Sequence, residues 1–435
     1  MWQNWIVIGA ALTYIGALFL IASYGDRLRT VQRGRARMLI YPLSLGVYCT
    51  SWTFFGSVGF ATRSGLDFLA IYLGPMVMIG LCTPLVLRIV QLAKTQNITS
   101  IADFIAARYG KSQWVAATVA LIAIFGSIPY IALQLKAVSA SLETILGTIQ
   151  PAGSASSWLL GDIFFGDVAL MVAISMATFA VLFGTRHTDA TEHQDGLMLA
   201  IATESIIKLM AFVAVGLFVL FWMFPDTVEL TLLTMKNVLT RHTVGNAPIS
   251  LTFLTMTLLS FFAILLLPRQ FHVTVVENYS PAEVKRAKWV FPLYLLAINL
   301  FVMPIAVAGL FTFPLGNVDS DMFVLSLPLS ANSFTFAIVA FVGGLSAATA
   351  MVIVETVALA IMVSNDIIVP LMLQRRAARG AGGDNIGKLL LQIRRVAIFG
   401  ILMLAYVYYR SAGSAQLAAI GLLSFAAVAQ FAPAF

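Results

Sequence analysis

Long apolar runs, separated by short polar segments, make up most of this chain of 435 residues. Many of the runs reach the roughly 20 residues that an α-helix needs to cross a bilayer. This pattern predicts an all-α polytopic membrane protein with eleven spans. We expect the spans at about residues 4–24, 38–60, 66–90, 113–145, 162–184, 195–224, 251–275, 288–313, 334–373, 391–409 and 414–435.

The charged residues support this interpretation and orient the chain. Only 10% of the residues are charged, whereas a soluble domain carries about 25%. Segment 25–37 has five arginines and segment 374–395 has six basic residues, but 146–161 and 314–333 have none. Because Lys and Arg collect in cytoplasmic loops, we expect an extracytoplasmic N-terminus. The net charge of +7 then reflects this membrane topology, and we expect no nucleic-acid partner.

The spans divide into one extra helix and two sets of five. Residues 1–37 hold the first span and its basic loop, and the sets occupy 38–224 and 251–435, with an extracytoplasmic connecting loop at 225–250. Because five is odd, the second set must be inverted relative to the first, as in a five-plus-five inverted repeat. The chain stops inside an apolar run, so we expect the second set to be truncated near the end of its tenth core helix.

Several spans carry residues that interrupt helices. The second contains "YPLSLGVYCTSWTFFGSVGF", the fourth contains Pro129, and the ninth contains Gly343 and Gly344. Interrupted helices are tolerated in membranes where they line a cavity, and in transporters they mark the solute site. Small residues also serve close helix packing. Together the interruptions favour transport.

Longer motifs resemble a known family. "ITSIADFIAARYG" (98–110) and "SAQLAAIGLLSFAAVAQFAPA" (414–434) resemble segments of the sodium/solute symporter family. "FGTRHTDATEHQDGLMLAIATESIIKL" (183–209), "LLLPRQFHVTVVEN" (265–278) and "VSNDIIVPL" (363–371) are similar to the N-terminal transporter-like module of CbrA-type sensor histidine kinases.

The resemblance implies a LeuT-like fold entered after the extra helix, in a bacterial inner membrane. It implies a small organic solute as the ligand, namely an amino acid, with histidine as the first candidate. It also implies C-terminal kinase domains in cis, absent from this chain, and a response regulator as a partner. The alternatives are a stand-alone sodium- or proton-coupled symporter and a non-transporting receptor. No nucleophile–base set or metal-ligand cluster occurs in the spans, so we expect no enzyme activity from this segment.

The resemblance also locates an ion site between the first and eighth core helices. There the family uses backbone carbonyls and two side-chain hydroxyls to bind sodium. Aligned on Asp366, that hydroxyl pair falls on Ala350 and Met351, neither of which offers an oxygen. The family's aspartate falls on Tyr48, a weaker cation ligand. A tight sodium site of the usual kind is therefore doubtful.

A small register shift would bring two other hydroxyls, Ser346 and Thr349, to the ion site, so sodium stays open as the coupling ion. Glu355 offers a second route, because it lies 11 residues before Asp366, or about 16 Å along a helix. That places it near the midplane, where an ionisable group costs about 2.5–3.5 kcal/mol. We interpret Glu355 as a protonatable substitute for the ion site, with a buried structural hydrogen bond as the alternative.

The solute candidates lie near the interruptions. An aromatic ring beside exposed backbone groups suits an amphipathic solute such as an amino acid. The candidate solute ligands are Tyr48, Thr50, Ser51, Trp52, Tyr130 and Gln134. Glu204 and Lys208 are four residues apart, which predicts a local salt bridge.

Overall fold

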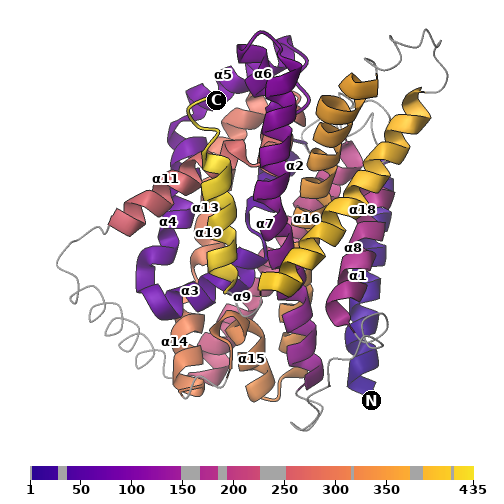
Figure 1. Cartoon of the computed structure of the whole chain (residues 1–435). Coiled ribbons are helices and arrows are strands. Elements are labelled where there is room, and N and C mark those ends of the chain that lie inside the picture. The colour runs from indigo at the N-terminus through magenta and orange to yellow at the C-terminus, as the bar shows by residue number, and fades with distance from the viewer. Residues whose placement is uncertain are drawn as a thin grey trace.

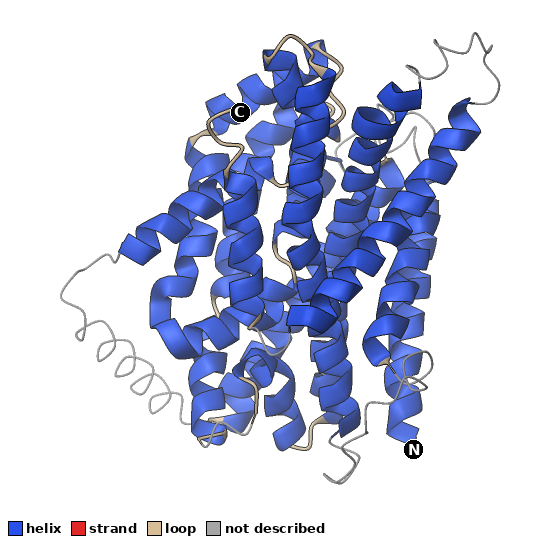
Figure 2. Cartoon of the chain, in the orientation of Figure 1, coloured by secondary structure: helices blue, strands red, loops and turns tan. Residues whose placement is uncertain are grey.

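A computed structural model describes residues 2–27, 37–147, 167–184, 194–225, 251–314, 318–372, 386–412 and 416–435. Helices and the loops between them account for all of these residues, with no strand among them (Figure 2). Helices α1, α7, α8 and α16 run roughly along one direction, with α5 and α6 at one end of the molecule and α14 and α15 at the opposite end (Figure 1).

The first half of the chain forms the following helices. They are α1 (Trp2–Arg27), α2 (Arg37–Ser44), η1 (Leu45–Tyr48), η2 (Trp52–Gly56), α3 (Ser57–Ser64), η3 (Gly65–Leu69), α4 (Ala70–Met76), η4 (Val77–Leu81), α5 (Thr83–Thr95), α6 (Ile101–Arg108), α7 (Gln113–Gly147), α8 (Val168–Gly184), α9 (Asp195–Phe218) and η5 (Val219–Met223).

The second half forms a further series. It comprises α11 (Leu251–Leu266), α12 (Pro268–Phe271), η6 (His272–Val276), α13 (Pro281–Asn299), α14 (Val302–Thr312), η7 (Ser320–Met322), α15 (Phe323–Ser330), α16 (Phe334–Met362), η8 (Val363–Ile368), α18 (Ile386–Ala412) and α19 (Leu417–Ala429).

The expected all-α membrane architecture is confirmed. Among the described residues, seven helices are long and apolar enough to cross a membrane, or eight if the bent pair α11 and α12–η6 is one span. The eleven predicted spans do not match these helices one to one. The second and third merge into a helical stretch from Trp52 to Leu81, while Ala169–Leu182 and Leu417–Ala429 are apolar but shorter than a full span.

Helix α16 lies at the centre of the bundle. It packs against α9, α7, α8 and α18, and nearly every residue from Ala337 to Met362 is buried. Its sequence permits this position, because its side chains are apolar all round and can pack against protein on every face. The extra helix α1 packs on α9 and on α16, and it leaves leucines and isoleucines such as Leu12 and Leu20 exposed, as a lipid-facing helix does.

Two of the expected interruptions are continuous helix. Helix α7 runs through Pro129, and α16 runs through Gly343 and Gly344. The two glycines instead make room for aromatic rings of η2. A Cβ atom at Gly343 would lie 2.6 Å from Phe54 Cζ, and one at Gly344 would lie 2.2 Å from Phe55 Cζ. The prediction of breaks at these two places was therefore wrong, and small-residue packing is the reason for the glycines.

Two other helices are broken. The second predicted span breaks as expected, because Cys49 leaves the helical region (φ −78°, ψ 95°) between η1 and η2. A second break, which the sequence did not predict, lies at Leu267 (φ −66°, ψ 131°). There α11 and the helix that begins at Pro268 meet at 54°.

Some expectations fall outside the described residues. These include the connecting loop 225–250 and most of the two basic segments that were used to orient the chain. The division into two five-helix repeats and the extracytoplasmic N-terminus therefore remain predictions.

Candidate functional site

The break at Cys49 is held by side chains of α7. Thr50 Oγ1 lies 3.0 Å from the hydroxyl of Tyr130, and the amide of Ser51 donates to Gln134 Oε1 at 3.1 Å. Gln134 Nε2 in turn donates to the carbonyl of Tyr130. Four of the predicted solute ligands thus meet at one point, as their positions at a break and on one helical face suggested. All four are buried.

The other two predicted ligands lie beside this cluster. Tyr48 donates its hydroxyl to the carbonyl of Ile71 at 2.7 Å. The ring of Trp52 packs 6.0 Å from that of Tyr72, and a Cβ atom at Gly421 would lie 2.7 Å from the indole. Both side chains are almost fully buried. In this structure Tyr48 and Trp52 therefore hold η1 and η2 against the surrounding helices.

Lys208 on α9 reaches the same break from the other side. Its Nζ donates to the carbonyls of Gly46 and Cys49, at 2.6 Å each. The carbonyl of Gly46 also accepts a hydrogen bond of 3.0 Å from the amide of Cys49, and Cys49 itself lies at the break, outside the regular helical pattern. The side chain is fully buried. The predicted local salt bridge between Lys208 and Glu204 was wrong, because among the described residues the two make no ion pair within 4 Å.

Glu204, one helical turn before Lys208, contacts the two hydroxyls that were expected at the ion site. Thr349 donates to Glu204 Oε1 at 2.6 Å, and Ser346 donates to the Glu204 carbonyl at 2.9 Å. The hydroxyl of Tyr14 on α1 also donates to Oε1, at 3.1 Å. Ser346 and Thr349 thus bind a helix of the protein at positions where an ion was expected.

Glu355 forms a fully buried ion pair. Its Oε2 lies 2.9 Å from Nη1 of Arg269, and its Oε1 accepts a hydrogen bond of 2.6 Å from Ser127. Arg269 follows the second break directly, in α12, and its guanidinium lies over the ring of Tyr130, 4.3 Å from the centroid. Tyr130 therefore touches residues at both breaks: its hydroxyl contacts Thr50 and its ring contacts Arg269.

Sequence reasoning missed Arg269 and Lys208 as site residues. Arg269 was quoted within a motif, but nothing in the periodicity placed it beside Glu355. A usable signal was present, because each is a basic residue inside an apolar run, where ionisable groups are rare and are usually paired. Glu355 was singled out by that rule, and the same rule applied to basic residues would have found both.

A further cluster ties the helices together at the end near α5 and α6. Arg37 pairs with Asp195 and with Glu283 (3.0 Å), and it donates to the Glu277 carbonyl at 2.8 Å. Its guanidinium also lies 3.6 Å from the ring centroid of Tyr279. These contacts join α2, α9, η6 and α13, so this basic residue does more than orient the chain.

A smaller ionic cluster lies at the opposite end, and its acid, Asp321, is outside the helices that could cross a membrane. Asp321 in η7 accepts from Arg63 (3.4 Å) and from the amide of Leu417 (3.2 Å). A Cβ atom at Gly59 would lie 1.8 Å from Asp321 Oδ1, so this approach of α3 needs glycine. Burial, with a contribution from Asp319, raises the pKa of Asp321 to about 6.

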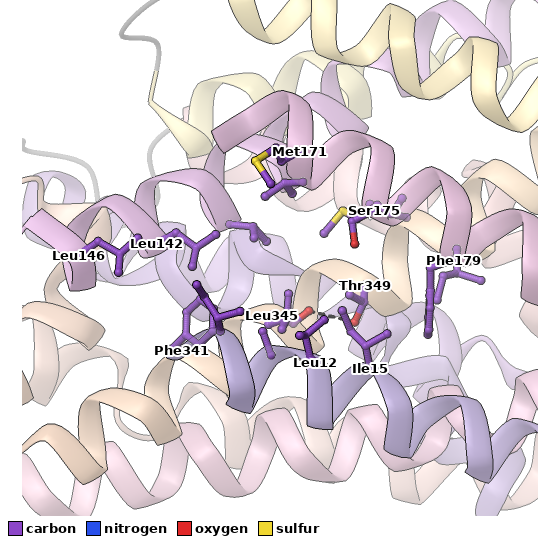
Figure 3. A pocket seen from close by; sticks show the side chains of 17 residues that line it. Leu12, Ile15, Leu142, Leu146, Met171, Ser175, Phe179, Phe341, Leu345 and Thr349 are labelled. Carbon is purple, nitrogen blue, oxygen red and sulfur yellow. Dashed lines mark hydrogen bonds between the residues drawn. The ribbon is translucent and has the colours of Figure 1, made fainter. Parts of the chain in front are cut away.

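A cavity of about 300 Å³ lies between α1, α7, α8 and α16 (Figure 3). Its walls are almost entirely aliphatic and aromatic, including Leu142, Phe179 and Phe341, and its polar side chains are Ser175 and Thr349. Thr349 already bonds Glu204. This lining gives a polar solute little to bind, so the polar cluster at the breaks is the better candidate site.

The architecture and the two broken helices define a class: a multi-pass membrane protein with a LeuT-like transporter fold. The chain is similar to a solved structure of a Na⁺-coupled sialic acid symporter in its substrate-bound, outward-open state. The TM-score is 0.67 at 14% sequence identity, over 99% of this chain and 86% of that chain. No family model and no curated protein matches the sequence. At this identity the likeness concerns the fold alone.

Proposed function

We propose that this chain binds a small organic solute at the two broken helices and carries it across the membrane by alternating access. One observation supports the proposal most directly: Tyr130 touches both breaks, through Thr50 and through Arg269. Broken helices in transporters present backbone groups to the solute near the midplane. The fold, similar to that of a symporter, supports the same conclusion.

The solute we propose is an amino acid, with histidine as the first candidate, on the basis of the motif resemblance. The candidate ligands remain Thr50, Ser51, Tyr130 and Gln134, with Trp52 and Tyr48 beside them. The driving ion is sodium or a proton. The named structural neighbour is Na⁺-coupled, and Glu355 is the protonatable candidate, here held by Arg269.

Counterflow in proteoliposomes tests this function. Vesicles loaded with unlabelled histidine should accumulate external labelled histidine through the wild-type protein. Tyr130→Phe removes the hydroxyl that meets Thr50 and should slow exchange. Tyr406→Phe removes a hydroxyl that bonds Asp167, from α18, and should leave exchange unchanged. Absence of exchange with every amino acid tried would contradict transport.

The second candidate is a receptor that binds without transport. Buried polar contacts hold both breaks in place, and each of these contacts must rearrange before the helices can separate. Their number favours a receptor. Saturable binding in detergent without counterflow in vesicles would identify a receptor.

We also propose that the solute signal reaches a histidine kinase that follows this module in the parent protein, in a bacterial inner membrane with the N-terminus outside. This rests on the motif resemblance. Autophosphorylation of the parent protein in vesicles, with and without histidine, tests it. Alkaline phosphatase fused to the N-terminus should be active if that end is extracytoplasmic.

A further inference from the structure

The contact between Lys208 and the broken helix η1 places a cation where the fold has exposed backbone oxygens. The carbonyls of Gly46 and Cys49 converge on one point, and Lys208 Nζ lies there, 2.6 Å from each. A fully buried ammonium needs such partners, because an unpaired charge in an apolar interior is strongly unfavourable. The carbonyl oxygens therefore serve the lysine in this structure.

Carbonyl oxygens are also what a small hard cation such as sodium requires in place of its water. In the family that the motifs resemble, the side-chain oxygens for the ion come from the helix that corresponds to α16. Ala350 and Met351 offer no oxygen there, and the hydroxyls of Ser346 and Thr349 both donate to Glu204. These positions therefore offer a sodium ion no hydroxyl that is not already hydrogen-bonded to Glu204.

The ammonium of Lys208 is the cation in contact with these carbonyls. The carboxylate of Glu204, one turn earlier on α9, accepts hydrogen bonds from Thr349 and Tyr14 and, among the described residues, makes no ion pair with Lys208. The nearby Arg269 is paired with Glu355. A sodium ion entering beside Lys208 would meet a like charge in a poorly solvated interior, where such repulsion is weakly screened.

We propose that the ammonium of Lys208 is a tethered cation that takes the place of a coupling sodium ion at the break in the first core helix. It follows that solute binding proceeds without sodium, and this second statement rests on the proposed function. The tethered cation itself does not depend on any solute. It binds α9 to the carbonyls of Gly46 and Cys49, so both hydrogen bonds must break whenever these segments move apart.

Thermal unfolding of the purified 435-residue protein tests the tethered cation without a solute. The midpoint is measured at constant ionic strength in sodium chloride, choline chloride and methylammonium chloride. The wild-type midpoint should be the same in all three salts. In choline, the midpoint of Lys208→Ala should be lower than that of the wild type. In sodium or methylammonium part of this loss should be recovered, because the vacated space and the two carbonyls accept a small cation.

Two further variants control this result. Lys136→Ala removes a half-buried lysine of α7 and should respond to the three salts as the wild type does. Lys208→Gln retains an amide donor and most of the volume, and serves if Lys208→Ala does not fold. It should lower the midpoint with no preference among the salts, because its side chain still fills the space.

A wild-type midpoint that is higher in sodium than in choline, with the same increase in Lys208→Ala, would overturn the proposal. An Ala variant that folds and distinguishes none of the salts would overturn it too.

Solute binding measured in sodium and in choline completes the test. Equal affinity supports the proposal and a requirement for sodium overturns it. Absence of binding in both salts refutes the proposed function and leaves the thermal result to decide on Lys208.

Discussion

Two fully buried cations lie near the broken helices, and they are neutralised in different ways. Lys208 is held by two backbone carbonyls, with no carboxylate in direct contact. Arg269 is held by a carboxylate, Glu355, and by the ring of Tyr130. The chemistry of each head group explains the difference, because an ammonium is a compact point charge and a guanidinium is a planar fork that stacks on aromatic rings. Loss of Arg269 leaves the charged carboxylate of Glu355 without its ion-pair partner. Loss of Lys208 removes hydrogen bonds only from two neutral backbone carbonyls.

Removal of Arg269 should produce the largest effect. Arg269→Met leaves the Glu355 carboxylate buried without its partner, and breaking a buried pair on one side costs about 3–5 kcal/mol. The double variant Arg269→Met with Glu355→Met removes both charges and should regain most of the loss. Thermal unfolding of the single and double variants checks this. A double variant less stable than either single one would show that the ion pair is not what matters.

Removal of Lys208 should cost less. Lys208→Met preserves much of the apolar stem but removes hydrogen bonds from a charged donor, at about 1.5–3 kcal/mol. The carbonyl of Gly46 keeps the amide of Cys49 as a partner, and no carboxylate loses a direct ion pair, so the loss should stay below that of Arg269→Met in the same unfolding assay. A larger loss for Lys208→Met would reverse the comparison drawn above.

The cluster at Asp321 extends the comparison to an ion pair whose acid lies outside the spans and whose arginine, Arg63, is partly exposed. Because the pKa of Asp321 is raised to about 6 in the folded protein, the folded state binds the proton more tightly than the unfolded state does. The resulting stability is fully present below about pH 4 and is lost as the pH rises through about 6, on the order of 3 kcal/mol. Asp321→Asn should flatten this part of the pH profile. A wild-type profile that rises over the same range would contradict the sign.

The smallest effect is expected at Ser127, which bonds the same carboxylate as Arg269. Ser127→Ala removes one hydrogen bond to a charged group and should cost about 1–2 kcal/mol. Ser141→Ala is the matched control on α7, because that hydroxyl bonds only its own helix, at Val138. Equal shifts in the unfolding midpoint for the two variants would mean that the contact with Glu355 contributes nothing beyond local helix effects.

The architecture could be predicted because it depends on local patterns. Apolar runs of sufficient length must be helical in a membrane, since each backbone group needs a partner within its own segment. The first break could be predicted from Gly, Ser and Thr in one span. The second break could not, because "LLLPRQF" differs little from α7, where Pro129 is accommodated without a break. Packing against neighbouring helices decides between these outcomes.

The proximity of two side chains could be predicted where a single helix face decides, as with Tyr130 and Gln134. Partners across the bundle could not. Glu355 and Arg269 are 86 residues apart, and nothing in the sequence sets the relative rotation of α12 and α16. Lys208 illustrates the same limit, because its spacing from Glu204 favours a salt bridge while tertiary contacts direct the ammonium to η1 instead.

The hydrogen bond from Tyr14 to Glu204 gives the extra helix α1 a role in how the molecule deforms. A helix that touches the core only through aliphatic side chains can slide along it at little cost. A hydrogen bond between a buried hydroxyl and a carboxylate resists such sliding, because displacement by a few ångströms breaks this contact. Helix α1 should therefore follow the displacement of α9, and the N-terminal end of the chain would travel with the innermost helices rather than with the lipid around it.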